Sequence, residues 1–253
     1  TSQLGAYQYL SKPVEPSILA ESVNRAIKNS RLRKANESLQ SISQSSFNVS
    51  DLIGCSPAIG NVKEAIRHIA PTNLSVLIHG ETGTGKELVA RALHQNSPRA
   101  NSPFVPVNCA ALNEQLAESL LFGHKKGAFT GATEGHQGLL EQANRGTLFL
   151  DEVSSLPPSV QGKLLRVIED RSVQPLASPK TRKLDVRFLA ASNTPLEKLI
   201  EKNQFRSDLY YRLCGVTIEV PPLRRRTSDI PMLALHFMKK FAHTIKKKLT
   251  GFS

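Results

Sequence analysis

Tryptophan is absent from this sequence of 253 residues, and aromatic residues make up only 6% of it. Aliphatic side chains must therefore fill the interior, and a hydrophobic content of 40% is enough for a sizeable core. No apolar run approaches the roughly 18 residues of a membrane span, and the N-terminus lacks the pattern of a signal peptide. We therefore expect a cytoplasmic protein without a membrane partner, built as one large domain or two smaller ones.

Cysteine is scarce as well. The three cysteines, Cys55, Cys109 and Cys214, stand far apart and without paired spacing. This spacing argues against both a zinc site and a disulfide framework. Free thiols are typical of a reducing cytosol, which agrees with the expected location.

Acidic residues are outnumbered by basic ones, 21 to 33, which gives a formal net charge of +12. The segment 223–248 holds eight lysines or arginines and a single acid, Asp229, and so carries more than half of that charge. Such a segment can bind nucleic acid or nucleotide phosphate, or it can be a solvated helical face. No base-reading motif accompanies the charge, so the sequence favours the solvated face.

The chain is organised around a glycine-rich segment, Gly-Glu-Thr-Gly-Thr-Gly-Lys-Glu, at residues 80–87. It follows an apolar run at 74–79 that is typical of a buried strand, and it precedes residues 88–94, which have helical spacing. Strand, glycine-rich turn and helix together are the context of a phosphate-binding loop. The backbone N–H groups of such a loop and the positive end of the following helix bind a polyphosphate.

Within this predicted loop, Lys86 would reach the β- and γ-phosphates of a nucleotide. Glu87 stands where serine or threonine usually supplies a magnesium ligand. The expected phosphate-binding residues are Gly80, Glu81, Thr82, Gly83, Thr84, Gly85, Lys86 and Glu87.

Strands and helices are predicted to alternate along the rest of the chain. Ser56 can cap a helix that takes Pro57 into its first turn. Further helices are expected at 114–122 and 160–168. Further strands are expected at 104–109, 146–152 and 184–193, and the first of these should be short and buried. This alternation predicts an α/β fold with a parallel sheet covered on both faces, and ligands of such sheets bind at the carboxyl ends of the strands.

Two acids, Asp151 and Glu152, end one of the predicted strands. An enzyme that hydrolyses a nucleoside triphosphate needs a carboxylate in the shell of Mg²⁺ and a group that orients or deprotonates the attacking water. Asp151 suits the first role and Glu152 the second. An apolar strand that ends in two acids is also a common structural cap, but its position after a phosphate loop favours the catalytic reading.

Charge on the transferred phosphoryl group requires a cation, which a neighbouring subunit often supplies as an arginine. Arg206 and Arg212 are candidates, although six helical positions leave them about 120° apart. Either arginine can instead form a surface ion pair, for example with Asp208, and the pattern alone does not decide between the two roles.

A third element, Gly-Ala-Phe-Thr-Gly-Ala at 127–132, favours neither strand nor helix. Its small residues are typical of a mobile loop that displays one aromatic ring, Phe129. The alternative is a structural turn in which that ring is buried.

Five motifs together resemble the central AAA+ domain of the sigma-54-dependent transcriptional activators of the nitrogen-regulatory type. The motifs occur in the order Gly80–Glu87, Val107–Leu112, Leu121–Ala132, Gly146–Glu152 and Phe205–Leu213. The likeness covers residues 51 to about 240, and the Gly-Ala-Phe-Thr-Gly-Ala motif is specific to this branch of AAA+ proteins. The family also carries glutamate after the loop lysine.

The resemblance implies a role for each matching position. Residues 80–87 would bind the phosphates of ATP, with Ile53 and Gly54 near its adenine. Asp151 would help to hold Mg²⁺, and Glu152 would activate water.

Further roles follow from the same resemblance. Asn108 would be a switch residue that restrains the glutamate until a partner is engaged, and Asn193 would sense the γ-phosphate. Arg206 and Arg212 would act in trans, which requires a ring of subunits, usually a hexamer. Residues that would contact sigma-54 are Gly127, Ala128, Phe129, Thr130, Gly131 and Ala132.

The resemblance also implies a domain order. Residues 1–33 resemble the last strand and helix of a receiver domain, and 34–50 form a linker. Independently of the resemblance, Leu32 and Leu39 are one heptad step apart, so a helix there could pair with its copy in the dimer expected of the inactive form. Residues 51–222 would be the ATPase core and 223–253 the start of a helical lid. The sequence is thus expected to be a piece of a longer regulator that reaches enhancer DNA only through a domain outside it.

Two other functions remain open at this point. The chain could be another AAA+ remodeller, such as an unfoldase that feeds a protease, although its 127–132 motif argues against that class. It could also be a catalytically inactive fragment that only oligomerises with intact copies.

Overall fold

The computed structural model describes residues 49–112, 114–128 and 135–245. The chain divides into two compact units, Thr1–Ser46 and Phe47–Ser253, and the described residues belong to the second. The expectations for a receiver remnant at 1–33 and for most of the linker at 34–50 therefore lie outside the described residues.

A five-stranded parallel sheet forms the centre of the second unit, with the strand order β2-β5-β8-β1-β9. The strands are β1 (Val76–His79), β2 (Phe104–Asn108), β5 (Thr147–Asp151), β8 (Arg187–Ser192) and β9 (Val216–Glu219). The predicted α/β fold with a parallel sheet is confirmed.

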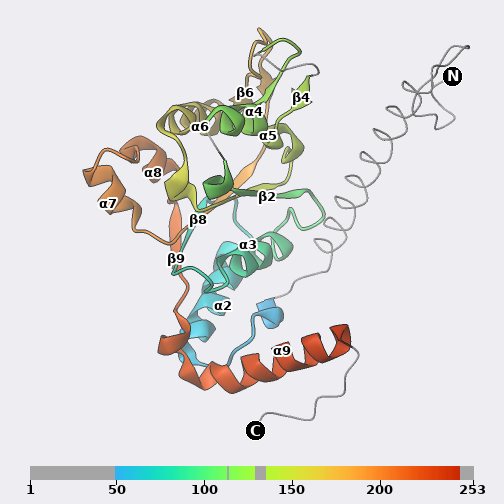
Figure 1. Cartoon of the computed structure of the whole chain (residues 1–253), viewed down its shortest axis with the longest axis vertical. Coiled ribbons are helices and arrows are strands. Elements are labelled where there is room, and N and C mark those ends of the chain that lie inside the picture. Colours follow the sequence, from blue (N-terminus) through green and yellow to red (C-terminus); the bar gives the residue numbers. More distant parts are fainter. Residues whose placement is uncertain (1–48, 113, 129–134, 246–253) are drawn as a thin grey trace, which may run out of the picture. The chain divides into compact units, whose positions relative to one another are not determined.

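Helices cover both faces of this sheet (Figure 1). They are α2 (Pro57–Ile69), α3 (Lys86–Gln95), α4 (Glu114–Phe122), α5 (Leu139–Gln142), α6 (Pro158–Asp170), α7 (Leu196–Glu201), α8 (Ser207–Leu213) and α9 (Ile230–Thr244). Two short antiparallel pairs join β3 (Gly123–His124) to β4 (His136–Gln137) and β6 (Ser172–Val173) to β7 (Arg182–Lys183).

The core has two halves, one on each face of the sheet, because successive strand residues point to opposite faces. Val76 and Ile78 of β1 pack with α2 and α3 in one cluster. Leu77, between them, belongs to the other cluster, which includes Leu164 of α6 and Leu209 of α8. Buried strand residues on both faces leave little polar surface on the sheet, so function is confined to its ends.

Helix α2 begins as its sequence predicts. The Ser56 side chain accepts a hydrogen bond from the Ile59 N–H at 3.4 Å, and Pro57 occupies the first helical position.

The expected buried strand at 104–109 is in part wrong. Strand β2 ends at Asn108 and lies at the edge of the sheet, where it pairs with β5 alone. Only Val107 among its residues is buried. An apolar run cannot reveal whether a strand lies at the centre or the edge, because pairing depends on distant segments.

Arg187, at the start of β8, is the largest buried polar side chain, with 2% of its surface exposed. Its guanidinium donates to three carbonyl oxygens, those of Leu74 at 3.2 Å, Ala70 at 2.9 Å and Ile69 at 3.1 Å. Burial lowers the pKa of Arg187 to about 10, so the group stays charged at neutral pH. It thereby closes the carboxyl end of α2 and ties it to the sheet.

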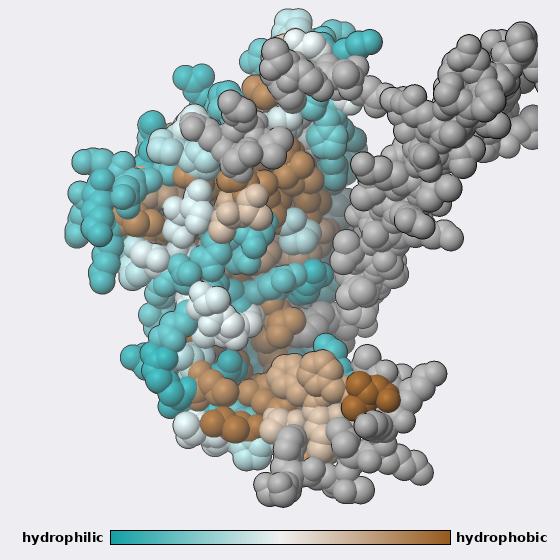
Figure 2. Space-filling view, in the orientation of Figure 1, coloured by the Kyte–Doolittle hydropathy of each residue, from teal (hydrophilic) through white to brown (hydrophobic). Residues whose placement is uncertain are grey.

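Helix α9 follows β9 through two short 3-10 turns, η5 (Leu223–Arg225) and η6 (Thr227–Asp229). It exposes large apolar side chains, which Figure 2 shows as a hydrophobic area over this helix. The exposed set on α9 is Ile230, Met232, Leu235, Phe237 and Phe241, and Ile245, just after the helix, is exposed as well.

The described part of the chain contains no helix that is both long and apolar enough to cross a membrane. All three cysteines are free thiols, as their spacing predicts. Among the same residues there is no cluster of three or more histidine, cysteine or acidic side chains that could hold a metal ion.

We predict that Arg187→Met destabilises the protein by about 3 kcal/mol, because three buried carbonyl groups lose their donor. Urea denaturation followed by circular dichroism measures the change in the free energy of unfolding. Arg166→Met, on the exposed face of α6, is the matched control and should leave the midpoint nearly unchanged. Equal midpoints for the two variants would contradict the structural role of Arg187.

Candidate functional site

The glycine-rich segment 80–87 forms a loop between the end of β1 and the start of α3. Gly83 and Gly85 adopt φ angles of 81° and 97°, in the left-handed region that favours glycine. A Cβ atom on Gly80 would lie 2.9 Å from the Val220 carbonyl oxygen, so this position has no room for a side chain. The backbone can therefore turn back toward the helix N-terminus, which is the geometry that binds anions.

Lys86, the first residue of α3, is buried except for 6% of its surface. Its Nζ donates to the carbonyl oxygens of Gly80 at 3.0 Å and Glu81 at 3.3 Å. The same Nζ lies 3.6 Å from Oε1 of Glu152. The structure thus brings together the loop lysine and the strand-end acid that the sequence analysis singled out separately.

Asp151 ends β5, and Glu152 follows in a left-handed backbone conformation with φ 51°. Such a conformation is strained for a residue with a side chain and is often found at functional sites. Burial raises the pKa of the Asp151 carboxyl, and the negative charge of Glu152 adds to the effect while Lys86 opposes it. The two half-buried carboxylates are ligands that suit Mg²⁺, because this ion is bound by one or two carboxylates together with phosphate oxygens.

The two asparagines lie at the carboxyl ends of β8 and β2, the strands on either side of β5. Asn193 follows β8, and its Nδ2 donates to Oγ1 of Thr82 in the loop at 3.2 Å. Asn108 ends β2, where it is paired in register with Asp151, but its Oδ1 accepts from the Ala110 N–H at 3.0 Å. No hydrogen bond joins Asn108 to Glu152 in the described part of the chain, so its expected switch role stays a prediction.

Arg206 and Arg212 lie at the two ends of α8, and their hydrogen-bond partners do not belong to the phosphate loop. The Arg206 guanidinium donates to both carboxylate oxygens of Asp208, at 3.0 and 2.7 Å. Arg212 pairs with Glu169 of α6 at 3.1 Å. Both arginines are exposed. The surface ion pair with Asp208 is therefore present, while the role in a neighbouring subunit stays a prediction.

The segment that carries Phe129 lies between β3 and β4. These strands pair Gly123 with Gln137 and His124 with His136, so they hold the two ends of the intervening loop together. Gly127, with φ 82°, and Ala128 belong to the described residues. Phe129, Thr130, Gly131 and Ala132 lie outside the described residues, so the choice between display and burial of the ring stays open.

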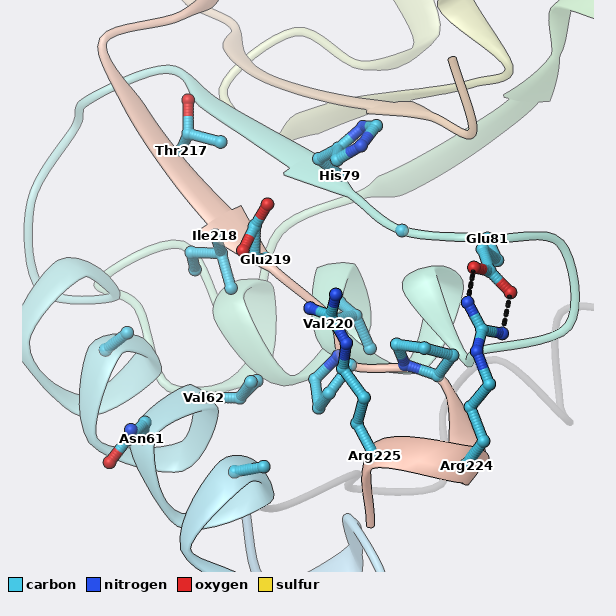
Figure 3. A pocket seen from close by; sticks show the side chains of 15 residues that line it. Asn61, Val62, His79, Glu81, Thr217, Ile218, Glu219, Val220, Arg224 and Arg225 are labelled. Atoms are coloured by element: carbon cyan, nitrogen blue, oxygen red, sulfur yellow. Dashed lines mark hydrogen bonds and ion pairs between the residues drawn. The ribbon is translucent and has the colours of Figure 1, made fainter. Parts of the chain in front are cut away.

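Sequence reasoning missed two arginines that contact the phosphate loop. Arg224 forms a bidentate ion pair with the Glu81 carboxylate, with one distance of 2.7 Å (Figure 3). Nη2 of Arg226 donates to the Thr84 carbonyl oxygen at 3.1 Å. The hydrogen bond from Arg224 lowers the pKa of Glu81.

The expectation of a solvated helical face at 223–248 did not foresee these loop contacts: Arg224 is exposed but pairs with Glu81, and Arg226 is half-buried against Thr84. These two residues precede α9 in the short turns after β9, whereas Lys239 and Lys240 are exposed on α9 itself. Pro231 is the sequence signal that could have separated the two groups, because proline favours the first turn of a helix and α9 begins at Ile230.

A cavity of about 680 Å³ lies beside the first two residues of the loop. Figure 3 shows its walls, which come from α2, β9 and the segment after β9 and include Asn61, Glu219 and Arg225. Neither Lys86 nor the acids of β5 line it. We place the chemistry at Lys86 instead, because the loop, Glu152 and Asn193 converge there.

Ile53 and Gly54 belong to the segment before α2, and a buried acid fixes this segment. Oδ1 of Asp229 accepts from the backbone N–H groups of Cys55 and Ser56, each at 2.8 Å, and Oδ2 accepts from Oγ of Ser56 at 2.7 Å. Gly54 has φ 143°, and a Cβ atom there would lie 2.6 Å from Oδ2 of Asp229.

Comparisons with known proteins identify the family of this chain. The family described as "Sigma-54 interaction domain" matches residues 52–219. The transcriptional regulatory protein ZraR of Salmonella typhimurium is 47% identical over 249 residues, which are 98% of this chain and 55% of that relative. The DNA-binding transcriptional regulator NtrC of Proteus hauseri is 47% identical over 240 residues, which are 95% of this chain and 50% of that relative.

A solved structure also resembles this chain along nearly its whole length. The crystal structure of NtrX from Brucella abortus in complex with ATP has a TM-score of 0.76 at 36% identity, and the match covers 98% of this chain and 52% of that chain. The chain thus spans about half the length of the curated relatives and of the solved structure that it matches.

We predict that Lys86→Ala abolishes binding of a nucleoside triphosphate, because the phosphate charge loses its buried cation. Glu152→Gln is the matched variant, since it keeps the size of the side chain and removes only the carboxylate charge. It should bind the nucleotide but hydrolyse it at least about 10²-fold more slowly. Calorimetric titration and a phosphate-release assay measure the two steps, and thermal melting checks that both variants fold. Full binding by Lys86→Ala would contradict the assignment of the site.

Proposed function

Since this chain belongs to the sigma-54-dependent transcriptional activators of the NtrC type, whose central domain has the AAA+ P-loop NTPase fold, we propose that it hydrolyses ATP. We further propose that the hydrolysis drives remodelling of the closed complex between sigma-54 RNA polymerase and the promoter. The single observation that carries the proposal is the contact set of Lys86, which joins the loop carbonyls to Glu152.

ATP would lie along the loop 80–87, with its γ-phosphate toward the ends of β5 and β8. Asn193, which donates a hydrogen bond to Thr82 of the loop, would sense that phosphate. Glu152 would orient and deprotonate the attacking water. The crystallised NtrX proteins include complexes with ADP and with ATP, which supports nucleotide binding by this chain.

Mg²⁺ would be held by Asp151 together with the phosphates of the nucleotide. The ion neutralises charge that develops on the transferred phosphoryl group. Asp151 is half-buried at the end of β5, where it is the register partner of Asn108 in β2.

The arginines of α8 support an active site that is shared between subunits. Arg206 and Arg212 are exposed and pair with Asp208 and Glu169, outside the loop of their own chain. We propose that one or both act on the nucleotide of a neighbouring subunit in a ring, usually a hexamer, and that the inactive form is a dimer. Enhancer DNA would be bound only through a domain outside this chain.

The loop at 127–132 would carry the contact with sigma-54. Its ends are held together by the β3–β4 pair, so movement of α4 and β3 could be passed to the tip. An unfoldase that feeds a protease would not need this motif, and degradation of a substrate together with a partner peptidase would identify that class.

We predict that ATPase activity per chain rises steeply with protein concentration, because each site takes an arginine from a second subunit. Arg212→Ala alone and Lys86→Ala alone should each lose about 10³-fold or more. A mixture of the two should regain part of the activity, since one interface then joins an intact loop to an intact arginine. Arg67→Ala, at an exposed position of α2, is the control. Activity that is constant with concentration, together with an inactive mixture, would contradict a shared site.

We predict that Phe129→Ala keeps the ATPase activity and loses retention of sigma-54 in the presence of an ATP transition-state analogue. The ring is expected at the contact, whereas the nucleotide is bound elsewhere in the chain. A pull-down with purified sigma-54 measures retention. Phe241→Ala, which removes an exposed ring from α9, is the matched control and should retain sigma-54. Equal retention of sigma-54 by both variants would contradict the proposed contact of Phe129 with sigma-54.

A further inference from the structure

The strand order gives the nucleotide site two distinct sides. β1 carries the phosphate loop and lies between β8 and β9. Asn193 and the acids of β5 lie on the β8 side, and this side must receive the γ-phosphate if the chain binds ATP as proposed. The nucleoside then has to leave the loop on the other side, toward β9 and the residues that follow it.

A short strap, residues 222–229, occupies that side. Its Arg226 donates to the Thr84 carbonyl oxygen at 3.1 Å, so the strap contacts the phosphate loop. Three residues later, the Asp229 N–H donates to the Arg226 carbonyl oxygen at 2.9 Å, which closes a 3-10 turn. At about 2 Å of rise per residue, this turn places Asp229 only about 6 Å farther along the strap.

Asp229 links the strap to the segment 53–56. It is fully buried, with 0% of its surface exposed, and it accepts three hydrogen bonds from Cys55 and Ser56. Burial raises the pKa of Asp229, but the hydrogen bonds from Ser56 and Cys55 and the charge of Arg226 outweigh it and lower the pKa below its usual value. The carboxylate is therefore ionised at neutral pH, and hydrogen bonds to a charged acceptor are stronger than neutral ones.

The segment is held from a second direction. Nζ of Lys63, on α2, donates to the Gly54 carbonyl oxygen at 2.9 Å. Gly54 also meets the carboxylate so closely that no side chain fits between them. Ile53 and Gly54 are nevertheless half-exposed, and Cys55 is exposed. This backbone is fixed by Asp229 and Lys63 and is still accessible to solvent, so it is suited to contact with a ligand.

We propose that Asp229 is a positioning residue for the nucleoside end of ATP. It holds the backbone of 53–56 at a fixed distance from the phosphate loop, so that this segment meets the adenine while the loop binds the phosphates. The inference rests on the proposed function and adds a residue that touches neither the phosphates nor the reacting water. Asp229 would also link the adenine site to α9, because it is the last residue before that helix.

The test compares two ligands that share a phosphate chain, Mg·ATP and Mg·tripolyphosphate, on the full 253-residue chain. Asp229→Asn keeps the size of the side chain and removes its charge. We expect it to weaken ATP binding by on the order of tenfold and to change tripolyphosphate binding by less than about twofold. Lys86→Ala should lose both ligands. Calorimetric titration gives the dissociation constants.

The outcomes separate the inference from the function on which it rests. Equal weakening of both ligands by Asp229→Asn overturns the inference, because it shows a general loss of structure. Unchanged binding of both ligands overturns it as well. Wild-type chain that binds neither ligand overturns the proposed function and the inference together.

A measurement on the wild type covers the case in which the variant does not fold. Hydrogen exchange read by mass spectrometry should show that ADP slows exchange at 53–56, whereas tripolyphosphate slows it only at 80–87. Equal protection of 53–56 by both ligands, or by neither, overturns the inference. Gly54→Ala, which pushes a methyl group against the Asp229 carboxylate from the other side, should reproduce the ligand-selective loss.

Discussion

A nearly buried ammonium group is the constraint on which the rest of this structure depends. Removing the Lys86 charge from water is costly unless oxygen atoms replace the solvent. Two carbonyl groups of its own loop and the Glu152 carboxylate supply them. The carbonyls require the tight turn that the glycines at 83 and 85 allow, and the carboxylate requires β5 to end beside the loop. The glycines meet the first requirement, and the sheet order, with only β8 between β5 and β1, meets the second.

Much of this could be predicted from the sequence, because the signals are local. The loop lies within eight consecutive residues, and the cap of α2 depends on Ser56 and Pro57. Alternating strands and helices predicted the parallel sheet. The contacts that could not be predicted join segments far apart in the chain: Arg224 meets Glu81 across 143 positions, and Arg187 meets Ala70 across 117. No period or turn signal reports such pairs, and the edge position of β2 was missed for the same reason.

The arginines show where pattern and geometry diverge. Arg206 and Arg212 were singled out by their motif, yet within the chain they form ion pairs that are typical of a solvated surface. Exposed pairs of this kind contribute little to stability, so a stronger acceptor can displace Asp208 or Glu169 at small cost. Arg224 and Arg226 carried no motif of their own, yet they contact the phosphate loop directly. Charge alone could not separate these two groups, because all four residues have the same chemistry.

Acidic and basic side chains lie on opposite sides of the loop, so the two ends of the site differ in charge. The acids of β5 lie toward β8, the side on which Mg²⁺ and the γ-phosphate are proposed to bind. The arginines of the strap lie toward β9, where they contact Glu81 and Thr84 of the loop. A nucleotide that entered in the reverse direction would set its terminal phosphates away from Asp151, the carboxylate proposed to hold Mg²⁺. If ATP binds as proposed, the order of the strands sets its direction before any side chain contacts the adenine.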